Sequence, residues 1–395
     1  MKINSKLLYL LSDIFNKSLP FISVFYITNH IPPSEYGVLE LVVSFYILYG
    51  FMITLGFDGW MLSKYYKLEE SEFLTSVSVM LWSISITSVI LISISLFVSI
   101  YTTVIFLIGF SCAILNIYTT LLRLKGEYGY AGGYLLLNSS ISFIFLIVFF
   151  EFFDASLFTR LLGLSITAFI TLSIILRKFY IKYYISIGIN DIRIIRSIAI
   201  FGLPLSLSIV SSWLKGNIDK LYINQLISTT DLGIYSLALQ ISSVINVICI
   251  SLNKILQTAF IKKISDCCSI GKDIFIVSLA LAFISVLYFI FTKFIIFNFV
   301  DIAYSEAILL LPYLLLSFWF GSIVMLINNI FIYYENTKFI FYQVVTIATV
   351  HTGLSFFLIQ IHMMKGAVYS SVISSFIGLL LTLYFLFITR QSNNI

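Results

Sequence analysis

The sequence feature that most constrains the fold is a run of 50 residues, from Phe73 to Leu122, without Asp, Glu, Lys or Arg. A helix needs about 20 mainly apolar residues to cross the hydrocarbon core of a bilayer, so the run is too long for one crossing. Two helices joined near residues 99–103 fit it. Only 10% of the chain is charged, against about a quarter of a soluble domain. The sequence therefore predicts an all-α membrane protein.

Other charge-poor segments predict further membrane spans. Apolar stretches of spanning length number about twelve. They fall at residues 8–29, 38–58, 74–98, 102–122, 131–150, 155–176, 197–222, 233–257, 274–297, 307–332, 339–361 and 366–389. Arg160 and Lys293 lie near the ends of two of these spans, where long side chains can reach the interface.

The distribution of Lys and Arg between the spans predicts the orientation. Of the 23 basic residues, sixteen fall on the side of the N-terminus and four on the opposite side, and Lys17, Lys215 and Lys254 lie within spans. Cytoplasmic loops carry the excess of Lys and Arg. We therefore expect both termini in the cytoplasm and a location in the bacterial inner membrane. This asymmetry explains the net charge of +5, so no nucleic-acid partner is expected.

The sequence shows no signature of a metal, cofactor or nucleotide site. Its four cysteines are Cys112, Cys249, Cys267 and Cys268, which lack the spacing of metal ligands or of a disulfide framework. The sequence Gly-Lys-Asp at 271–273 lacks the first glycine and the hydroxyl of a phosphate-binding loop. We expect no cofactor and no enzymatic activity.

The chain is similar to itself at an offset of 196 residues. Segments 34–38 and 230–234 share the order hydroxyl, acid, apolar or aromatic residue, Gly, and Val or Ile. Each lies between the first and second span of its half, and the pattern is typical of a helix N-cap or tight turn. This placement favours an internal duplication over coincidence. Paired six-helix halves around a central cavity are an architecture of transporters.

Around these segments the chain resembles the O-antigen flippases (Wzx type) of the multidrug/oligosaccharidyl-lipid/polysaccharide exporter superfamily. The N-terminal half carries Leu-Pro at 19–20 and Pro-Ser-Glu-Tyr-Gly at 33–37, similar to the family pattern LP…LsPeeYG. The C-terminal half carries Phe-Gly-Leu-Pro at 201–204, Asp-Lys at 219–220 and the segment 230–235, similar to fglP…DR…vGiYs.

The resemblance implies a fold, a substrate and partners. The fold is MATE-like, with two six-helix lobes around a central cavity, at residues 1–176 and 197–395, and a cytoplasmic linker at 177–196. The function is translocation of a polyprenyl pyrophosphate-linked oligosaccharide, an O-antigen or related polysaccharide repeat unit used in lipopolysaccharide biosynthesis, across the inner membrane by alternating access. The partners are this substrate, membrane lipids and the polysaccharide assembly machinery.

The leading span of each half carries an acid and a base on one helix face. Asp13 and Lys17 are four residues apart, as are Lys215 and Asp219. They are either self-neutralising pairs near the interface or ligands, because ammonium groups pair with the phosphates of a lipid pyrophosphate. We interpret Lys17, Lys215 and Asp219 as substrate-binding. By resemblance Lys220 joins them, although it stands where the family commonly has Arg and loses the guanidinium fork.

The eighth span carries a polar stripe. Asn246 and Asn253 share it with Ser242, Ser243 and Gln257. These side chains either hydrogen-bond a sugar or bond to a neighbouring helix. We take Asn246 and Asn253 as candidates for substrate binding.

Four residues are candidates for coupling or gating, and Asp13 is the first of them. Asp58 and Lys254 close the second span of each half at the same offset of 196, either as a gate pair or as helix ends at the interface. His351 lies in the middle of the eleventh span. It either relays protons or packs as a neutral histidine.

Two other functions compete with the flippase. A MATE-like drug/cation antiporter would favour acids in its pocket, whereas three lysines lie within the spans here. A membrane polysaccharide polymerase would need a large outer loop with catalytic Arg or His, but the outer loops are short and contain only His30 and His362.

Overall fold

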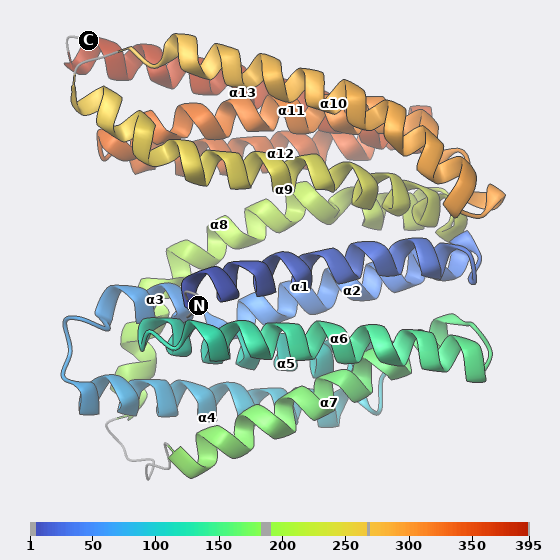
Figure 1. Ribbon diagram of the computed structural model, residues 1–395, viewed down its shortest axis with the longest axis vertical. Helices are drawn as coiled ribbons and strands as arrows, with labels where there is room; N and C mark the ends of the chain where they lie inside the picture. Colours follow the sequence, from blue (N-terminus) through green and yellow to red (C-terminus); the bar gives the residue numbers. More distant parts are fainter. Residues whose placement is uncertain (1–4, 183–190, 267–268, 394–395) are drawn as a thin grey trace. The chain divides into compact units, whose positions relative to one another are not determined.

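The protein is built from helices, and a computed structural model gives their arrangement (Figure 1). The structure describes residues 5–182, 191–266 and 269–393, without a strand in these ranges. The chain divides into two compact units. Unit 1 is Met1–Ile31 with Leu39–Val210, and unit 2 is Pro32–Val38 with Ser211–Ile395. The lobe boundaries expected from the sequence stay predictions, and residues 183–190 of the expected linker lie outside the described residues.

Unit 1 is organised around α5. Its elements are α1 (Ser5–Thr28), most of α2 (Pro33–Thr54), α3 (Phe57–Lys64), α4 (Glu70–Ser95), α5 (Ile100–Leu124), α6 (Tyr128–Phe152), α7 (Leu157–Lys182) and the first part of α8 (Asp191–Leu226). Helix α5 packs against α3, α4, α6 and α7, and α1 runs along α6 (Figure 1).

Unit 2 is organised around α11. Its elements are the rest of α8, α9 (Thr229–Ser265), α10 (Gly271–Phe299), the 3₁₀-helix η1 (Ile302–Tyr304), α11 (Ala307–Tyr333), α12 (Thr337–His362) and α13 (Met364–Asn393). Helix α11 packs against α9, α10 and α13, and α12 packs along α13.

The helices confirm the predicted all-α membrane fold. In the described residues ten are long and apolar enough to cross a membrane, and the bent helix α8 makes up to eleven. Helix α8 bends by 46° between Ile194–Gly202 and Ser206–Leu226. The break includes Pro204, which lacks the N–H that an unbroken helix needs. Helix α1, which we predicted to be a span, is not among these membrane-length helices. Its 24 residues include Asp13 and Lys17.

The second span ends earlier than the sequence predicts. We expected it to reach residue 58, but α2 ends at Thr54 and α3 begins at Phe57. Leu55 and Gly56 between them have φ of 47° and 66°, a left-handed backbone that interrupts a right-handed helix. Asp58 therefore lies in α3 and does not close a membrane span.

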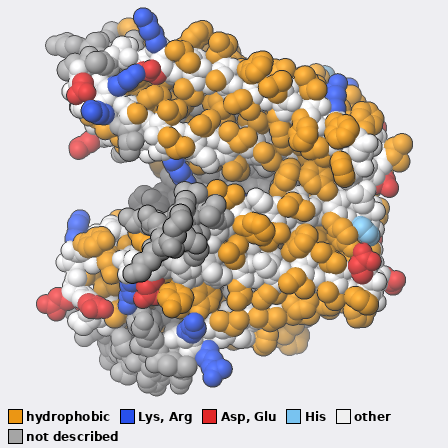
Figure 2. Space-filling view, in the orientation of Figure 1, with side chains coloured by type: hydrophobic (Ala, Val, Ile, Leu, Met, Phe, Trp, Pro, Cys, Tyr) orange, Lys and Arg blue, Asp and Glu red, His pale blue; other side chains and the backbone are white. Residues whose placement is uncertain are grey.

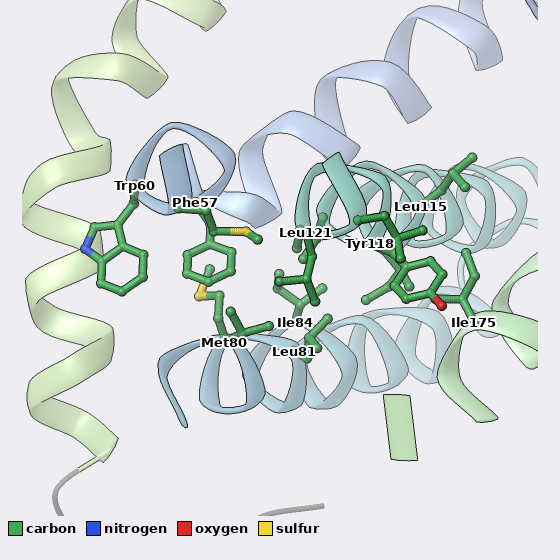
Figure 3. Close-up of a cluster of buried hydrophobic side chains, with 14 of the residues drawn as sticks. Phe57, Trp60, Met80, Leu81, Ile84, Leu115, Tyr118, Leu121 and Ile175 are labelled. Atoms are coloured by element: carbon green, nitrogen blue, oxygen red, sulfur yellow. The ribbon is translucent and has the colours of Figure 1, made fainter. Parts of the chain in front are cut away.

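Helix α3 anchors the apolar core of unit 1 (Figure 3). Trp60 stacks on Phe57, with ring centroids 5.4 Å apart, and on Phe73 of α4 at 6.2 Å. Burying one such aromatic side chain contributes about 1.5–3 kcal/mol. Side chains from α4, α5 and α7 complete the cluster. They include Met80, Leu81, Ile84, Leu115, Tyr118, Leu121 and Ile175.

The outer surface is apolar. Figure 2 shows hydrophobic side chains over much of the visible face, with Lys, Arg, Asp and Glu gathered toward the helix ends. On α10, Phe283, Phe291 and Phe294 are exposed. Since exposed apolar surface on this scale is unfavourable in water, it is the surface expected to face lipid.

Both copies of the repeated motif begin a helix, as predicted. Helix α2 starts at Pro33, and proline is favoured in the first turn, where its missing N–H costs no helical hydrogen bond. Helix α9 starts at Thr229, and Ser228 caps it by accepting a hydrogen bond from the N–H of Asp231 at 3.1 Å.

The two motif copies contact each other within unit 2. A Cβ on Gly37 would lie 2.3 Å from the carbonyl oxygen of Thr229, and a Cβ on Gly233 would lie 1.9 Å from that of Pro33. Both distances are far below van der Waals contact, so each position needs glycine for this close approach. The repeat that the sequence reveals is thus a packing motif.

Candidate functional site

A polar cavity lies inside unit 1. It has a volume of about 320 Å³ and is lined by α1, α2, α5, α6 and α7. Its polar lining is made of amides, hydroxyls and two basic side chains. These residues are Asn16, Lys17, Ser23, Tyr46, Ser111, Asn138, Ser139, Ser142, Arg160 and Thr167. Among the lining residues there is no Asp or Glu.

Arg160 is the buried cation of this cavity. It lies in the first turn of α7, yet its side chain turns inward and the residue is only 9% exposed. Its Nη1 donates a hydrogen bond to the carbonyl oxygen of Ser142 on α6 at 3.2 Å, whereas its Nε has no partner among the described residues. The sequence prediction that Arg160 reaches the interface is therefore wrong.

Lys17 lines the same cavity from α1. Its Nζ lies 2.7 Å from Oδ2 of Asp13, with the two side chains 54% and 33% exposed. The predicted shared face of Asp13 and Lys17 is confirmed. Such an exposed pair contributes only about 0–1 kcal/mol, so Asp13 does not hold Lys17 firmly away from a ligand.

Unit 2 holds a buried network around Asp219. The carboxylate oxygen Oδ2 accepts hydrogen bonds from the hydroxyl of Tyr235 at 2.7 Å and of Ser371 at 3.4 Å. It also lies 3.2 Å from Nε2 of His351. Asp219 and His351 are 3% and 0% exposed. The second oxygen, Oδ1, has no hydrogen-bond partner among the described residues.

Serines continue this network around the imidazole of His351. The hydroxyl of Ser374 lies 3.2 Å from Nδ1. The hydroxyl of Ser355 lies 3.5 Å from Nε2 and 2.8 Å from that of Ser370. The network thus joins α8, α9, α12 and α13, and both imidazole nitrogens have polar neighbours.

Lys215 lies one turn before Asp219 on α8. Its Nζ donates to the hydroxyl of Ser375 at 3.2 Å, and that hydroxyl lies 2.9 Å from Ser317. No ion pair between Lys215 and Asp219 forms in the described structure, so the alternative of a self-neutralising pair does not hold for these two residues. The carboxylate of Asp219 is engaged by Tyr235 and His351 instead.

The other predicted site residues are more scattered. Lys220 is buried, at 6% exposure. Asn253 accepts a hydrogen bond from Nδ2 of Asn329 on α11 at 2.8 Å, which is the helix-to-helix alternative. Asn246 and Lys254 are exposed on α9, and α9 continues beyond Lys254 to Ser265.

Arg160 and Tyr235 are candidates that the sequence alone does not reveal. Arg160 is close to the end of its predicted span, which made an interfacial position the simplest expectation. Tyr235 lies in the family-like segment 230–235, and its place in that segment is the feature of the sequence that could have pointed to it. Metal sites gain no support, since the described residues contain no group of three His, Cys, Asp or Glu able to hold an ion.

Comparisons of sequence relate the chain to a family of polysaccharide biosynthesis proteins. The family described as polysaccharide biosynthesis protein matches residues 4–261. A Haemophilus influenzae protein of the Lsg locus is 24% identical over 262 residues, which cover 62% of this chain and 63% of that protein. The chain therefore spans less than two thirds of this curated relative.

Comparisons of structure identify the fold. The lipid II flippase MurJ, in an inward closed conformation, matches with a TM-score of 0.75 at 13% identity, over 96% of this chain and 87% of that one. An inward-facing multidrug resistance MATE family transporter matches with a TM-score of 0.70 at 14% identity, over 95% and 96% of the two chains. The family match covers most of the chain, and the chain belongs to the polysaccharide biosynthesis protein family, with a MurJ- and MATE-like transporter fold.

Proposed function

We propose that the chain is a flippase that carries a polyprenyl pyrophosphate-linked oligosaccharide, an O-antigen or related repeat unit, across the inner membrane by alternating access. The observation that carries this proposal is the unit 1 cavity, where cationic, amide and hydroxyl groups line a space among membrane-length helices. Such groups are the natural ligands of phosphates and sugar hydroxyls. The family and the likeness to a lipid II flippase support it.

Lys17 is the proposed substrate-binding residue with the most direct support, because it lines the cavity. Lys215 also stays a proposed ligand: an ammonium has three hydrogens, and its contact with Ser375 uses one. Lys220, Asn246 and Asn253 stay proposed binding residues, and Asp13, Asp58 and Lys254 stay proposed gating residues.

We assign the coupling role to His351, with a proton as the coupling ion, and propose that Asp219, which we expected to bind substrate, acts as its partner. Nε2 of His351 lies 3.2 Å from Oδ2 of Asp219, and Oδ1 of Asp219 is a second acceptor without a partner among the described residues. The pair is contacted by the titratable Tyr235 from α9, while α13 contributes the hydroxyls of Ser371 and Ser374. An imidazole beside the carboxylate favours proton transfer over binding of a metal cation.

The drug/cation antiporter receives less support. Its cationic substrates would meet Arg160 and Lys17 in the cavity, without an acidic lining residue to pair with. A polymerase would need catalytic groups that neither the described cavity nor the short loops supply. The proposal therefore includes the absence of enzymatic activity.

Deletion of the gene tests the function. Surface polysaccharide should disappear while lipid-linked repeat units accumulate in the inner membrane, because translocation and not synthesis is blocked. Complementation with the full chain serves as the control. Normal surface polymer in a strain without a second flippase would overturn the proposal.

Reporter fusions test the proposed orientation. Fusions after Lys125, Lys263 and Arg390 should all report cytoplasm, since these residues belong to the basic side of the membrane. A periplasmic signal from any one of them would contradict the proposed cytoplasmic termini.

A further inference from the structure

The feature that points beyond the proposed function is the charge of Arg160. A guanidinium stays protonated in proteins, and this one is 9% exposed inside a bundle of membrane-length helices. A buried charge is normally paired with an opposite charge. Arg160 makes no ion pair among the described residues, and its Nη1 donates a hydrogen bond to the neutral carbonyl of Ser142.

Two other cations in the spans, Lys17 and Lys293, have a way to lower this cost. Lys17 pairs with Asp13 at 2.7 Å. Lys293 is exposed, with its Nζ 4.7 Å from the centre of the Phe289 ring. Arg160 has no acid beside it among the described residues, and its side chain lines the cavity.

The surroundings of Arg160 suit a sugar that carries an anion. The cavity volume of about 320 Å³ is at the lower end of the range for small-molecule sites. Asn138, Ser111 and Thr167 line it with amide and hydroxyl groups, which hydrogen-bond sugar hydroxyls. The unpartnered Nε of Arg160 belongs to the planar fork that binds oxyanions with two parallel hydrogen bonds.

We infer that Arg160 binds an oxyanion of the transported saccharide in the unit 1 cavity. This inference rests on the proposed function and assigns an anionic group of the proposed substrate to this site. The oxyanion is either the carboxylate of an acidic sugar or a phosphate of the lipid carrier. Lys17, at the same cavity, supplies a second positive charge.

Thermal unfolding of the purified full chain in detergent, with three separate additives, tests the inference. The additives are glucuronate, glucose and inorganic pyrophosphate, each compared at the same ionic strength. A ligand that binds only the folded state raises its stability. We expect glucuronate or pyrophosphate to raise the unfolding temperature and glucose to leave it unchanged. Glucuronate alone would identify an acidic sugar as the source, and pyrophosphate alone would identify the carrier.

Variants of Arg160 connect any shift to this residue. Arg160→Gln should weaken anion binding by about tenfold to a hundredfold, since a hydrogen bond to a charged group is lost. Arg160→Lys keeps the charge without the fork and should lose part of the affinity. Lys293→Gln removes a charge elsewhere in the membrane and should keep the full shift.

A second readout separates binding from a structural role. Without ligand, Arg160→Gln should unfold at the same temperature as the natural chain or higher, because it removes an uncompensated buried charge. A large decrease in the unfolding temperature of Arg160→Gln would overturn the inference if Arg160→Lys unfolds normally and still binds the anion fully. In that case the role of Arg160 is structural. An anion-induced shift that survives Arg160→Gln would also overturn the inference, as would no shift with either anion. If these tests fail while gene deletion still abolishes surface polymer, the flippase stands and only this site is lost.

Discussion

The two units solve the problem of polar groups in a membrane protein in opposite ways. Unit 1 surrounds an open cavity with polar groups and leaves the guanidinium of Arg160 without an acid among the described residues. Unit 2 encloses Asp219 in a buried hydrogen-bonded network, in contact with Tyr235 and His351. An unpaired group beside free space can bind a ligand, whereas a closed network can hold or pass a proton. Arg160 and Asp219 therefore differ in their surroundings, because one faces open space and the other a hydrogen-bonded network.

The leading acid and base of each half show the same difference on a smaller scale. In unit 1, Asp13 and Lys17 pair with each other near the surface. In unit 2, Lys215 and Asp219 have the same spacing but separate partners, Ser375 and His351. Equal sequence spacing places each pair of residues on one face of its helix. The neighbouring helices determine which side chains those residues contact.

The largest effect is expected from a substitution that breaks the unit 2 network at the imidazole of His351. His351→Gln keeps a hydrogen-bonding side chain but cannot take up a proton, so transport driven by a pH gradient should fall to the level of protein-free vesicles. The measurement uses the reconstituted full chain, lipid-linked saccharide and a pH-sensitive dye. His362→Gln, at the exposed end of α12, is the control. Transport that follows a sodium gradient and ignores His351→Gln would reject proton coupling.

The next largest effect is the difference in stability lost when Asp219 or Asp13 is replaced. Asp219→Ala leaves Tyr235 and His351 without their acceptor, and breaking a buried pair costs about 3–5 kcal/mol. Asp13→Ala removes an exposed pair that contributes about 0–1 kcal/mol. Unfolding of both variants in detergent, monitored by circular dichroism, measures the difference. Equal losses of stability would show that the two units do not differ as described.

A smaller effect tests the glycine contact of unit 2. Gly37→Ala and Gly233→Ala each place a methyl group against a carbonyl oxygen, and overpacking typically costs about 1–3 kcal/mol. Gly216→Ala is the matched control, because a Cβ there meets nothing within 4 Å and alanine is favoured over glycine by about 0.8–1.0 kcal/mol in a helix. Gly37→Ala and Gly233→Ala should unfold at a lower temperature than the natural chain, and Gly216→Ala should unfold at a higher one. A stable Gly233→Ala chain would refute the close approach.

The smallest effect distinguishes an open from a closed interior with thiol chemistry. Cys112 lines the unit 1 cavity, whereas Cys249 is buried among apolar side chains of unit 2. In a chain with Cys267 and Cys268 replaced by Ser, a small polar thiol reagent should label Cys112 faster than Cys249. Mass spectrometry of the digested protein locates the label. Preferential labelling of Cys249 would mean that water reaches unit 2 more readily than unit 1.

The fold could largely be predicted because its main cause is local. Long apolar stretches such as 73–122 leave few alternatives to membrane helices, and the predicted spans correspond to long helices. The short helix α3 was not predicted, because the left-handed backbone at Leu55 and Gly56 is fixed by packing around Phe57 and Trp60. Apolar composition continues across this break and hides it.

The site could be predicted only in part because its contacts join distant segments. Helical spacing brought Lys17 and Asp13 together, and the central position of His351 in its span marked it as unusual. Nothing in the spacing indicates that His351 meets Asp219, or that Arg160 turns inward from a helix end. Those contacts depend on how neighbouring helices rotate, which a single sequence does not encode in a readable pattern.

The contact between Gly37 and Gly233 has a consequence for the history of the chain. Each copy of the motif packs directly against the other copy, so a larger residue in either copy disrupts the packing of both. Mutational drift elsewhere can erase the likeness of two duplicated halves, since their helices need only remain apolar. At this junction the copies restrain each other. The two motif copies therefore keep a likeness that the apolar helices around them are free to lose.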